Sequence, residues 1–250
     1  MAKKYFTMSF DDGLEQDKRI IEILKRYQLS ATFNLNAGLF GEKGLMGRIG
    51  NYGIKYVKEV PKSLWMKYCY CNRIPEDEVR QVYQGFEIAS HAYRHENLKE
   101  LDADMLEEAI GRDIQKLTEI AGYKIVGHAY PSGANSSEAE ACLREHQIEY
   151  ARCVTSSKSF QFPENPLQYN PTVWFIEKDL FNLADKFLRS EAQEDQIFYV
   201  WGHGYELDFG TKQCNWYQFE RFCELMAGRN DITYCNNRDA FRMHRKEADK

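Results

Sequence analysis

Long apolar runs are missing from this sequence. No stretch approaches the roughly 20 consecutive apolar residues that a membrane-spanning helix requires, so we expect no insertion into a membrane. Near the N-terminus, Asp11-Asp12-Gly13 interrupts the only short apolar run that follows Lys3 and Lys4, which leaves no segment of signal-peptide length. We therefore predict a cytoplasmic protein.

Basic tracts and a cysteine framework are missing as well. The 33 basic and 38 acidic residues give a net charge of −5, and the basic residues form no cluster, which argues against nucleic acid as a partner. The seven cysteines are odd in number and scattered. Only Cys69 and Cys71 lie close together, with no second pair to complete a zinc site. Reduced thiols are therefore their expected state in the cytosol.

Segments of strand and helix type alternate along most of the chain. Short apolar segments typical of buried strands lie at residues 5–10, 31–35, 86–89, 124–130, 150–154, 197–201 and 231–235. Apolar residues at helical spacing lie at 20–27, 76–83, 101–121, 136–147, 178–190 and 215–228. This alternation predicts one α/β domain over residues 1–250 with a mostly parallel sheet, open or closed into a barrel. Residues 41–75 do not fit it, and we interpret them as an insertion that covers a site.

Polar residues follow the predicted strands at four places. Asp11 and Asp12 follow the first strand, and His91, Pro131-Ser132-Gly133 and His203 follow later ones. Functional sites of parallel α/β folds lie at the carboxyl ends of the strands, so we expect these residues to share one site.

Two histidines four residues apart, His91 and His95, can bind one metal ion from the same face of a helical turn. A catalytic zinc takes three protein ligands and a water, so a third ligand must come from elsewhere. The pair Asp11-Asp12 offers two carboxylates that point in different directions, one for the metal and one for the water. His203 lies between two glycines, which lets a ligand approach closely.

These segments, in chain order, resemble the motifs of the polysaccharide deacetylase family, the NodB-like domain of carbohydrate esterase family 4. Residues 9–13 (SFDDG) resemble its T-F-D-D-G motif, and residues 90–95 (SHAYRH) resemble its (S)-H-[ST]-x-x-H motif. Residues 129–133 (AYPSG) resemble a diverged R-x-P-[YF]-G, and His203 matches the late histidine motif. The first two motifs together are highly specific, and the matches extend from residue 9 to residue 203.

The resemblance implies a distorted (β/α) barrel of about seven parallel strands. It also implies a hydrolase that removes an N-acetyl group from an acetylated sugar or oligosaccharide with a divalent metal, usually zinc. Asp12, His91 and His95 would be the metal ligands. Asp11 would be the general base and His203 the general acid.

Other roles are less fixed, because the third motif departs from the family pattern. Ala129 replaces an arginine that usually orients the base, and we hypothesise that Arg152 reaches Asp11 instead. Ser132 replaces an aromatic residue, and its backbone N–H would face the oxyanion. Tyr130 and Trp201 are the other expected substrate contacts. The Asp-Trp motif that usually supports the acid is not identified.

Three alternatives stay open. A carbohydrate-binding pseudoenzyme is favoured by the altered third motif. A hydrolase of another non-peptide C–N bond would use the same groups. Two histidines and a carboxylate also form the iron site of non-haem oxygenases, although the usual order there is H-x-D…H.

Overall fold

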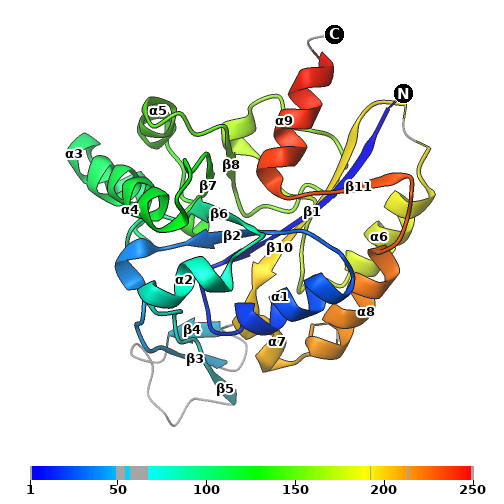
Figure 1. Cartoon of the computed structure of the whole chain (residues 1–250), viewed down its shortest axis with the longest axis horizontal. Helices are drawn as coiled ribbons and strands as arrows, with labels where there is room; N and C mark the ends of the chain where they lie inside the picture. The colour runs from blue at the N-terminus through cyan, green and yellow to red at the C-terminus, as the bar shows by residue number, and fades with distance from the viewer. Residues whose placement is uncertain (1, 49–53, 57–66, 192, 213, 249–250) are drawn as a thin grey trace.

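The computed structural model describes residues 2–48, 54–56, 67–191, 193–212 and 214–248 (Figure 1). Within these ranges the main sheet has eight strands in the order β8-β7-β6-β2-β1-β10-β9, with β11 beside β1, and all its strand pairs are parallel. The strands are β1 (Lys4–Asp11), β2 (Thr32–Leu35), β6 (Glu87–Ser90), β7 (Gly127–Ala129), β8 (Tyr150–Arg152), β9 (Val173–Trp174), β10 (Gln196–His203) and β11 (Ile232–Tyr234). This curled sheet confirms the predicted distorted (β/α) barrel.

The strand β1 lies at the centre of the sheet and is buried along its whole length. On one side it pairs with β10. On the other, residues Lys4–Phe6 pair with β11 and residues Ser9–Asp11 pair with β2. Because both of its faces are covered, its sequence is an aromatic-rich run rather than an alternating one. The strand therefore delivers Asp11 to the middle of the carboxyl edge.

One parallel bridge, between Arg152 and Tyr169, joins β8 to the segment that continues into β9. The backbone N–H of Cys153 donates to Tyr169 O at 2.7 Å, and that of Thr172 donates to Tyr199 O on β10 at 2.9 Å. Through this segment the two ends of the strand order approach each other, and the ring of strands closes at one narrow seam.

Helices pack around the outside of the sheet (Figure 1). They are α1 (Asp17–Arg26), α2 (Glu76–Val82), α3 (Ala103–Leu106), α4 (Arg112–Ala121), α5 (Ser137–Glu145), α6 (Leu180–Arg189), α7 (Gly204–Phe209), α8 (Trp216–Met226) and α9 (Asn237–Ala248). The long helix predicted over 101–121 is present, but it contains a π-helical segment, η6 (Glu107–Gly111), between α3 and α4. It ends at Gly122 with φ 76°, a left-handed C-cap that glycine accepts without strain.

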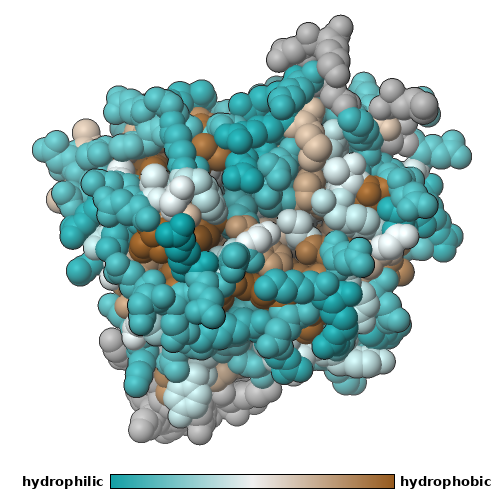
Figure 2. Space-filling model, in the orientation of Figure 1, coloured by the Kyte–Doolittle hydropathy of each residue, from teal (hydrophilic) through white to brown (hydrophobic). Residues whose placement is uncertain are grey.

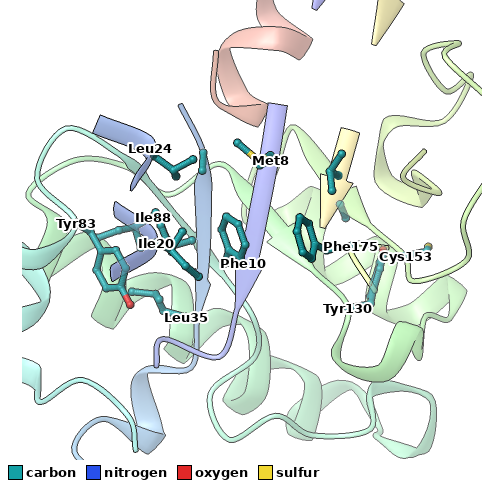
Figure 3. Packing of buried hydrophobic residues seen from close by; sticks show 14 of the residues in the cluster. Met8, Phe10, Ile20, Leu24, Leu35, Tyr83, Ile88, Tyr130, Cys153 and Phe175 are labelled. Atoms are coloured by element: carbon teal, nitrogen blue, oxygen red, sulfur yellow. The ribbon is translucent and has the colours of Figure 1, made fainter. Parts of the chain in front are cut away.

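Aliphatic and aromatic side chains fill the space between sheet and helices. Ile20 and Leu24 of α1 are fully buried on the face that covers the sheet, near Phe10 (Figure 3). The Phe10 ring stacks on that of Phe33 with centroids 5.7 Å apart. Each such side chain contributes about 1.5–3 kcal/mol by leaving water. Hydrophilic residues cover most of the face shown in Figure 2.

Part of the predicted insertion forms a second, antiparallel sheet of β3 (Leu45–Arg48), β4 (Ile54–Tyr56) and β5 (Lys67–Tyr70). Residues 49–53 and 57–66 lie outside the described ranges. Met46 and Cys69 of this sheet pack with Tyr205, which follows β10, in a small buried cluster. That contact places β3 beside the carboxyl ends of the main strands, while the role of 41–75 as a cover stays a prediction. No helix within the described ranges has the length and apolarity needed to cross a membrane.

Candidate metal centre and active site

The loops that leave β1, β6, β7 and β10 surround one cleft of about 350 Å³. Its lining residues are Asp11, Asp12, Met46, His91, His95, Ser132, Val154, Trp174, Trp201, His203 and Tyr205. Polar residues from separate strand ends thus meet at one place, as the strand-end argument predicts.

Backbone strain is concentrated in these loops. Four non-glycine residues here have positive φ: Asp12 (83°), Ala92 (60°), His95 (60°) and Ser132 (53°). Each conformation of this kind costs about 1–3 kcal/mol and persists only where the surroundings enforce it, commonly at functional sites. The segment His91–His95 is accordingly a turn with left-handed residues and not the helical turn that its spacing suggests.

Asp12, His91 and His95 each offer one ligand atom, and these atoms lie within 4.8 Å of one another. The Nε2 atoms of His91 and His95 are 4.0 and 3.9 Å from Asp12 Oδ1. The two imidazole rings meet edge to face, with centroids 4.9 Å apart. Three donors from two strand ends therefore surround one small volume.

The donors themselves fit a divalent cation. His91 Nδ1 lies 2.7 Å from Ala129 O, to which it donates as the protonated ring nitrogen. Its Nε2 and Asp12 Oδ1 are buried and have no hydrogen-bond partner among the described residues. Leaving such atoms unpaired is costly, and a histidine fixed by a carbonyl is a common arrangement around zinc. Burial lowers the pKa of His91 to about 4, so the ring is neutral, as a metal ligand must be.

Arg73, from the predicted insertion, is a site residue that the sequence analysis missed. Its Nη1 lies 3.2 Å from Asp12 Oδ1 and donates to Asn36 Oδ1 at 2.6 Å. Burial alone would raise the pKa of Asp12, but Arg73 and the neighbouring histidines lower it. Asp12 is therefore held as a carboxylate.

Asp11 lies in a dense set of donors. The Arg152 guanidinium donates to its Oδ2, and Asn34 Nδ2 donates to its Oδ1 at 2.7 Å. The Nε2 atoms of His91 and His203 lie 3.8 and 3.9 Å from Oδ2. Although burial would raise the pKa of Asp11, the Arg152 charge and these neighbours lower it. Asp11 is ionised and able to accept a proton.

His203 is oriented by a buried carboxylate. Its Nδ1 lies 2.7 Å from Glu206 Oε1, its backbone N–H donates to Glu206 Oε2 at 3.1 Å, and Trp174 Nε1 donates to Glu206 Oε1 at 2.9 Å. Burial would lower the pKa of His203, but Glu206 raises it to about 9. Glu206 therefore orients the His203 ring, and Trp174 holds Glu206 in place. The spacing of three residues between His203 and Glu206 is the feature of the sequence from which this contact could have been predicted.

Of the three expected substrate contacts, Ser132 and Trp201 line the cleft. Ser132 is exposed in the cleft. Trp201 lines the cleft but is only 5% exposed, because its ring stacks on Trp174 (centroids 5.2 Å apart) and lies 4.3 Å from the Arg152 guanidinium. Trp201 therefore forms part of the cleft wall, and its ring faces are covered by Trp174 and Arg152.

Tyr130 does not line the cleft, which corrects the expectation of a substrate contact. Its side chain is fully buried in the core, and its hydroxyl donates to Leu167 O at 2.9 Å (Figure 3). The reason is its place just after β7, where successive side chains point to opposite faces.

Comparisons with known proteins identify the family and the fold of the chain. Residues 1–151, more than half of the chain, match the family described as polysaccharide deacetylase. No curated protein matches. Among solved structures, the chain is similar to a protein from Mycobacterium smegmatis assigned to the polysaccharide deacetylases, with a TM-score of 0.65 and 14% identity over 99% of this chain and 92% of that one.

Two further structures share the fold. One is the carbohydrate esterase family 4 domain of a multidomain xylanase from the hindgut metagenome of Trinervitermes trinervoides (TM-score 0.56, 15% identity, 97% of this chain and 91% of that one). The other is a pseudoenzyme of family 4 from Bacillus anthracis (TM-score 0.53, 18% identity, 96% and 66%). The chain spans only 61%, 44% and 44% of three other solved proteins, from Streptococcus pyogenes, Bacillus anthracis and Bacillus cereus. On the family match, this chain belongs to the polysaccharide deacetylase family.

Proposed function

We propose that this protein hydrolyses the N-acetyl group of an acetylated sugar or oligosaccharide, using a divalent cation such as zinc held by Asp12, His91 and His95. The observation that carries the proposal is the convergence of these three donors, with the buried Nε2 of His91 left without a hydrogen bond among the described residues, beside the ionised carboxylate of Asp11.

An amide resists water because its carbonyl is a poor electrophile and its amine is a poor leaving group. A bound divalent cation supplies Lewis acidity that activates water and polarises the carbonyl. Asp11, kept ionised by Arg152, accepts the proton of the attacking water. General base assistance of this kind contributes about 10²–10⁴ to the rate.

His203 supplies the second proton transfer. As an imidazolium oriented by Glu206, it donates its Nε2 proton to the departing amine nitrogen while the C–N bond breaks. Its Nε2 lies 3.9 Å from Asp11 Oδ2, so acid and base face the same small volume. The backbone N–H of Ser132, at the rim of the cleft, is the proposed donor to the oxyanion.

The apolar part of the cleft suits an acetylated sugar. Met46, Val154, Trp174 and Trp201 line it, so a methyl group and one face of a sugar ring can leave water there. We propose that Trp174, the more exposed of the two stacked indoles, contacts the ring.

Acetate release tests the proposal. The purified protein, stripped of metal and then supplied with zinc, manganese or cobalt, is assayed on N-acetylglucosamine, its oligomers and its polymer. We expect release that depends on added metal and is abolished in Asp12→Asn and Asp11→Asn, which preserve side-chain size. His244→Asn, whose ring stacks on Phe162 outside the cleft, is the matched control.

A carbohydrate-binding pseudoenzyme is the second candidate, supported by the alanine at position 129 where the family has arginine. In that case the protein binds the same sugars, releases no acetate with any of the three metals, and Asp11→Asn binds as the parent does. Release of an amine from an unacetylated C–N substrate, without acetate from any sugar, would instead identify another amide hydrolase.

A further inference from the structure

A second group of potential metal ligands lies outside the cleft, between η6 and α5. Glu107, Cys142 and His146 each offer one ligand atom, and these atoms lie within 4.8 Å of one another. His146 Nε2 is 2.7 Å from Glu107 Oε2, and Cys142 Sγ is 4.0 Å from the same oxygen. Among the described residues, this group and the Asp12–His91–His95 set are the two with such geometry.

Gly111 makes the room in which these side chains meet. Its φ of −61° is ordinary for a helix, so the backbone does not require glycine here. A Cβ at this position would lie 2.7 Å from His146 Nε2 and closer still to the Glu107 carboxylate. The helix therefore lacks a side chain at the point where the imidazole and the carboxylate converge, as a binding cradle requires.

The helix is also irregular at this point. Glu107 and Gly111 are the ends of the π-helical segment η6, and π-turns inside α-helices are rare and frequent at functional sites. Ala109 O accepts a hydrogen bond from the backbone N–H of Tyr93 at 2.7 Å. Tyr93 lies between His91 and His95, so the widened turn connects this group to the loop of the cleft.

A surface ion pair alone does not account for the arrangement. The Glu107 side chain is 58% exposed, and an ion pair in such a position contributes little to stability. It also gives no reason for the thiol or for the glycine. A redox role for Cys142 fits poorly, because burial and the Glu107 charge raise the pKa of the thiol to about 11 and keep it protonated.

We propose that Glu107, Cys142 and His146 bind a second divalent cation of the zinc class. Thiolate, imidazole and carboxylate form a donor set that suits a tetrahedral zinc or cobalt ion, with water as the fourth ligand. On binding, Cys142 releases its thiol proton to solvent, and His146 gives up its Nε2 proton to solvent and binds as the neutral ring protonated on Nδ1. The hydrogen bond between Glu107 and His146 is thereby replaced by bonds to the ion.

Cobalt(II) distinguishes this site from the cleft, because only a thiolate ligand gives sulfur-to-cobalt charge-transfer absorption in the near ultraviolet. The metal-free full chain is titrated with cobalt chloride and followed by absorption and by equilibrium dialysis. We expect the absorption band in the parent protein and in Asp12→Asn. In Cys142→Ser we expect the band to be lost, together with one equivalent of bound cobalt. Cys235→Ser, a buried cysteine outside both groups, is the matched control and keeps the band.

Gly111→Ala provides a test that leaves all three ligands in place. Alanine favours the helix, so the variant folds, but its methyl group takes the space in which the Glu107 carboxylate meets His146 Nε2, so the carboxylate must move away. We expect at least a tenfold weaker affinity for the cobalt ion that gives the band, with circular dichroism unchanged. A band that survives in Cys142→Ser, or its absence from the parent protein at saturating cobalt, overturns the proposal. Because the readout is cobalt–sulfur absorption, either result is independent of whether acetate is released.

Discussion

Arg152 contacts Asp11 across 141 residues of sequence, from the strand next to the one that carries the family's usual arginine position. Ala129 on β7 and Arg152 on β8 are paired in register. The Arg152 guanidinium therefore starts from the neighbouring strand, at the same level of the sheet, and reaches the carboxylate at the end of β1.

Removing Arg152 is expected to impair both activity and stability. In Arg152→Ala the carboxylate of Asp11 stays buried without its cation, so we expect kcat to fall about 10²–10⁴-fold. Breaking a buried ion pair by removing one partner costs about 3–5 kcal/mol of unfolding free energy. Arg152→Lys keeps the charge and is expected to lose less. Acetate-release kinetics and urea denaturation measure both effects, and a kcat within about a factor of two of the parent contradicts the assignment.

The pH dependence of activity is expected to report on Glu206. Its charge holds the pKa of His203 at about 9, so the imidazolium persists below that pH and activity declines above it. Glu206→Gln removes the charge, lowers the pKa of His203 and moves the basic limb of the kcat/KM profile to lower pH. Asp208→Asn, on the same short helix, leaves the limb in place. A basic limb unchanged in Glu206→Gln argues against His203 as the acid.

A buried carboxylate in α1 makes folding stability depend on pH. Asp17 is fully buried, accepts hydrogen bonds from Tyr83 Oη at 2.7 Å and Leu14 N at 3.1 Å, and burial raises its pKa to about 8. Because the folded pKa lies above the unfolded one, its contribution is complete below about pH 4 and is lost as the pH rises through about 8.

The isosteric variant Asp17→Asn cannot ionise. We expect the unfolding free energy of the variant, measured by urea denaturation and taken relative to that of the parent, to increase as the pH rises from about 5 to about 8. A difference between the two proteins that does not change with pH contradicts this.

Metal removal is expected to destabilise the protein through the cleft. In a Cys142→Ser background, which leaves only the proposed cleft site, zinc at about 100 times its Kd stabilises by about 2.7 kcal/mol, seen as a rise in Tm. Chelation reverses the rise, and His95→Ala in the same background loses most of it. An equal rise in Tm without His95 excludes that residue as a ligand.

The sequence predicts the strands well where they are buried on both faces. The run at residues 5–10 becomes β1, and the helix over 101–121 and its stop at Gly122 are present. Two of the short elements, β9 and α7, were not predicted. β9 has two residues and α7 has six, which is too few for either periodicity to appear.

Some residues of the candidate site could be predicted from the sequence, and others could not. Residues that directly follow strands are brought together, because parallel topology places all carboxyl ends at one edge. Arg73, and the contact of Trp174 with Glu206, were missed because they depend on where an irregular segment and a two-residue strand fold back, and no local pattern encodes that. Tyr130 was misplaced because a motif fixes the backbone of the loop and not the face to which each side chain turns.

Within the part of the chain that the structure describes, the ring of strands closes at one bridge, and one of its two residues is Arg152. The backbone on either side of Arg152 joins β8 to Tyr169, while the Arg152 side chain places its charge beside the proposed base. We expect a fluctuation that separates β8 from Tyr169 to move the guanidinium away from Asp11 as well. The proposed hydrolytic activity and the closure of the barrel are therefore expected to be lost together.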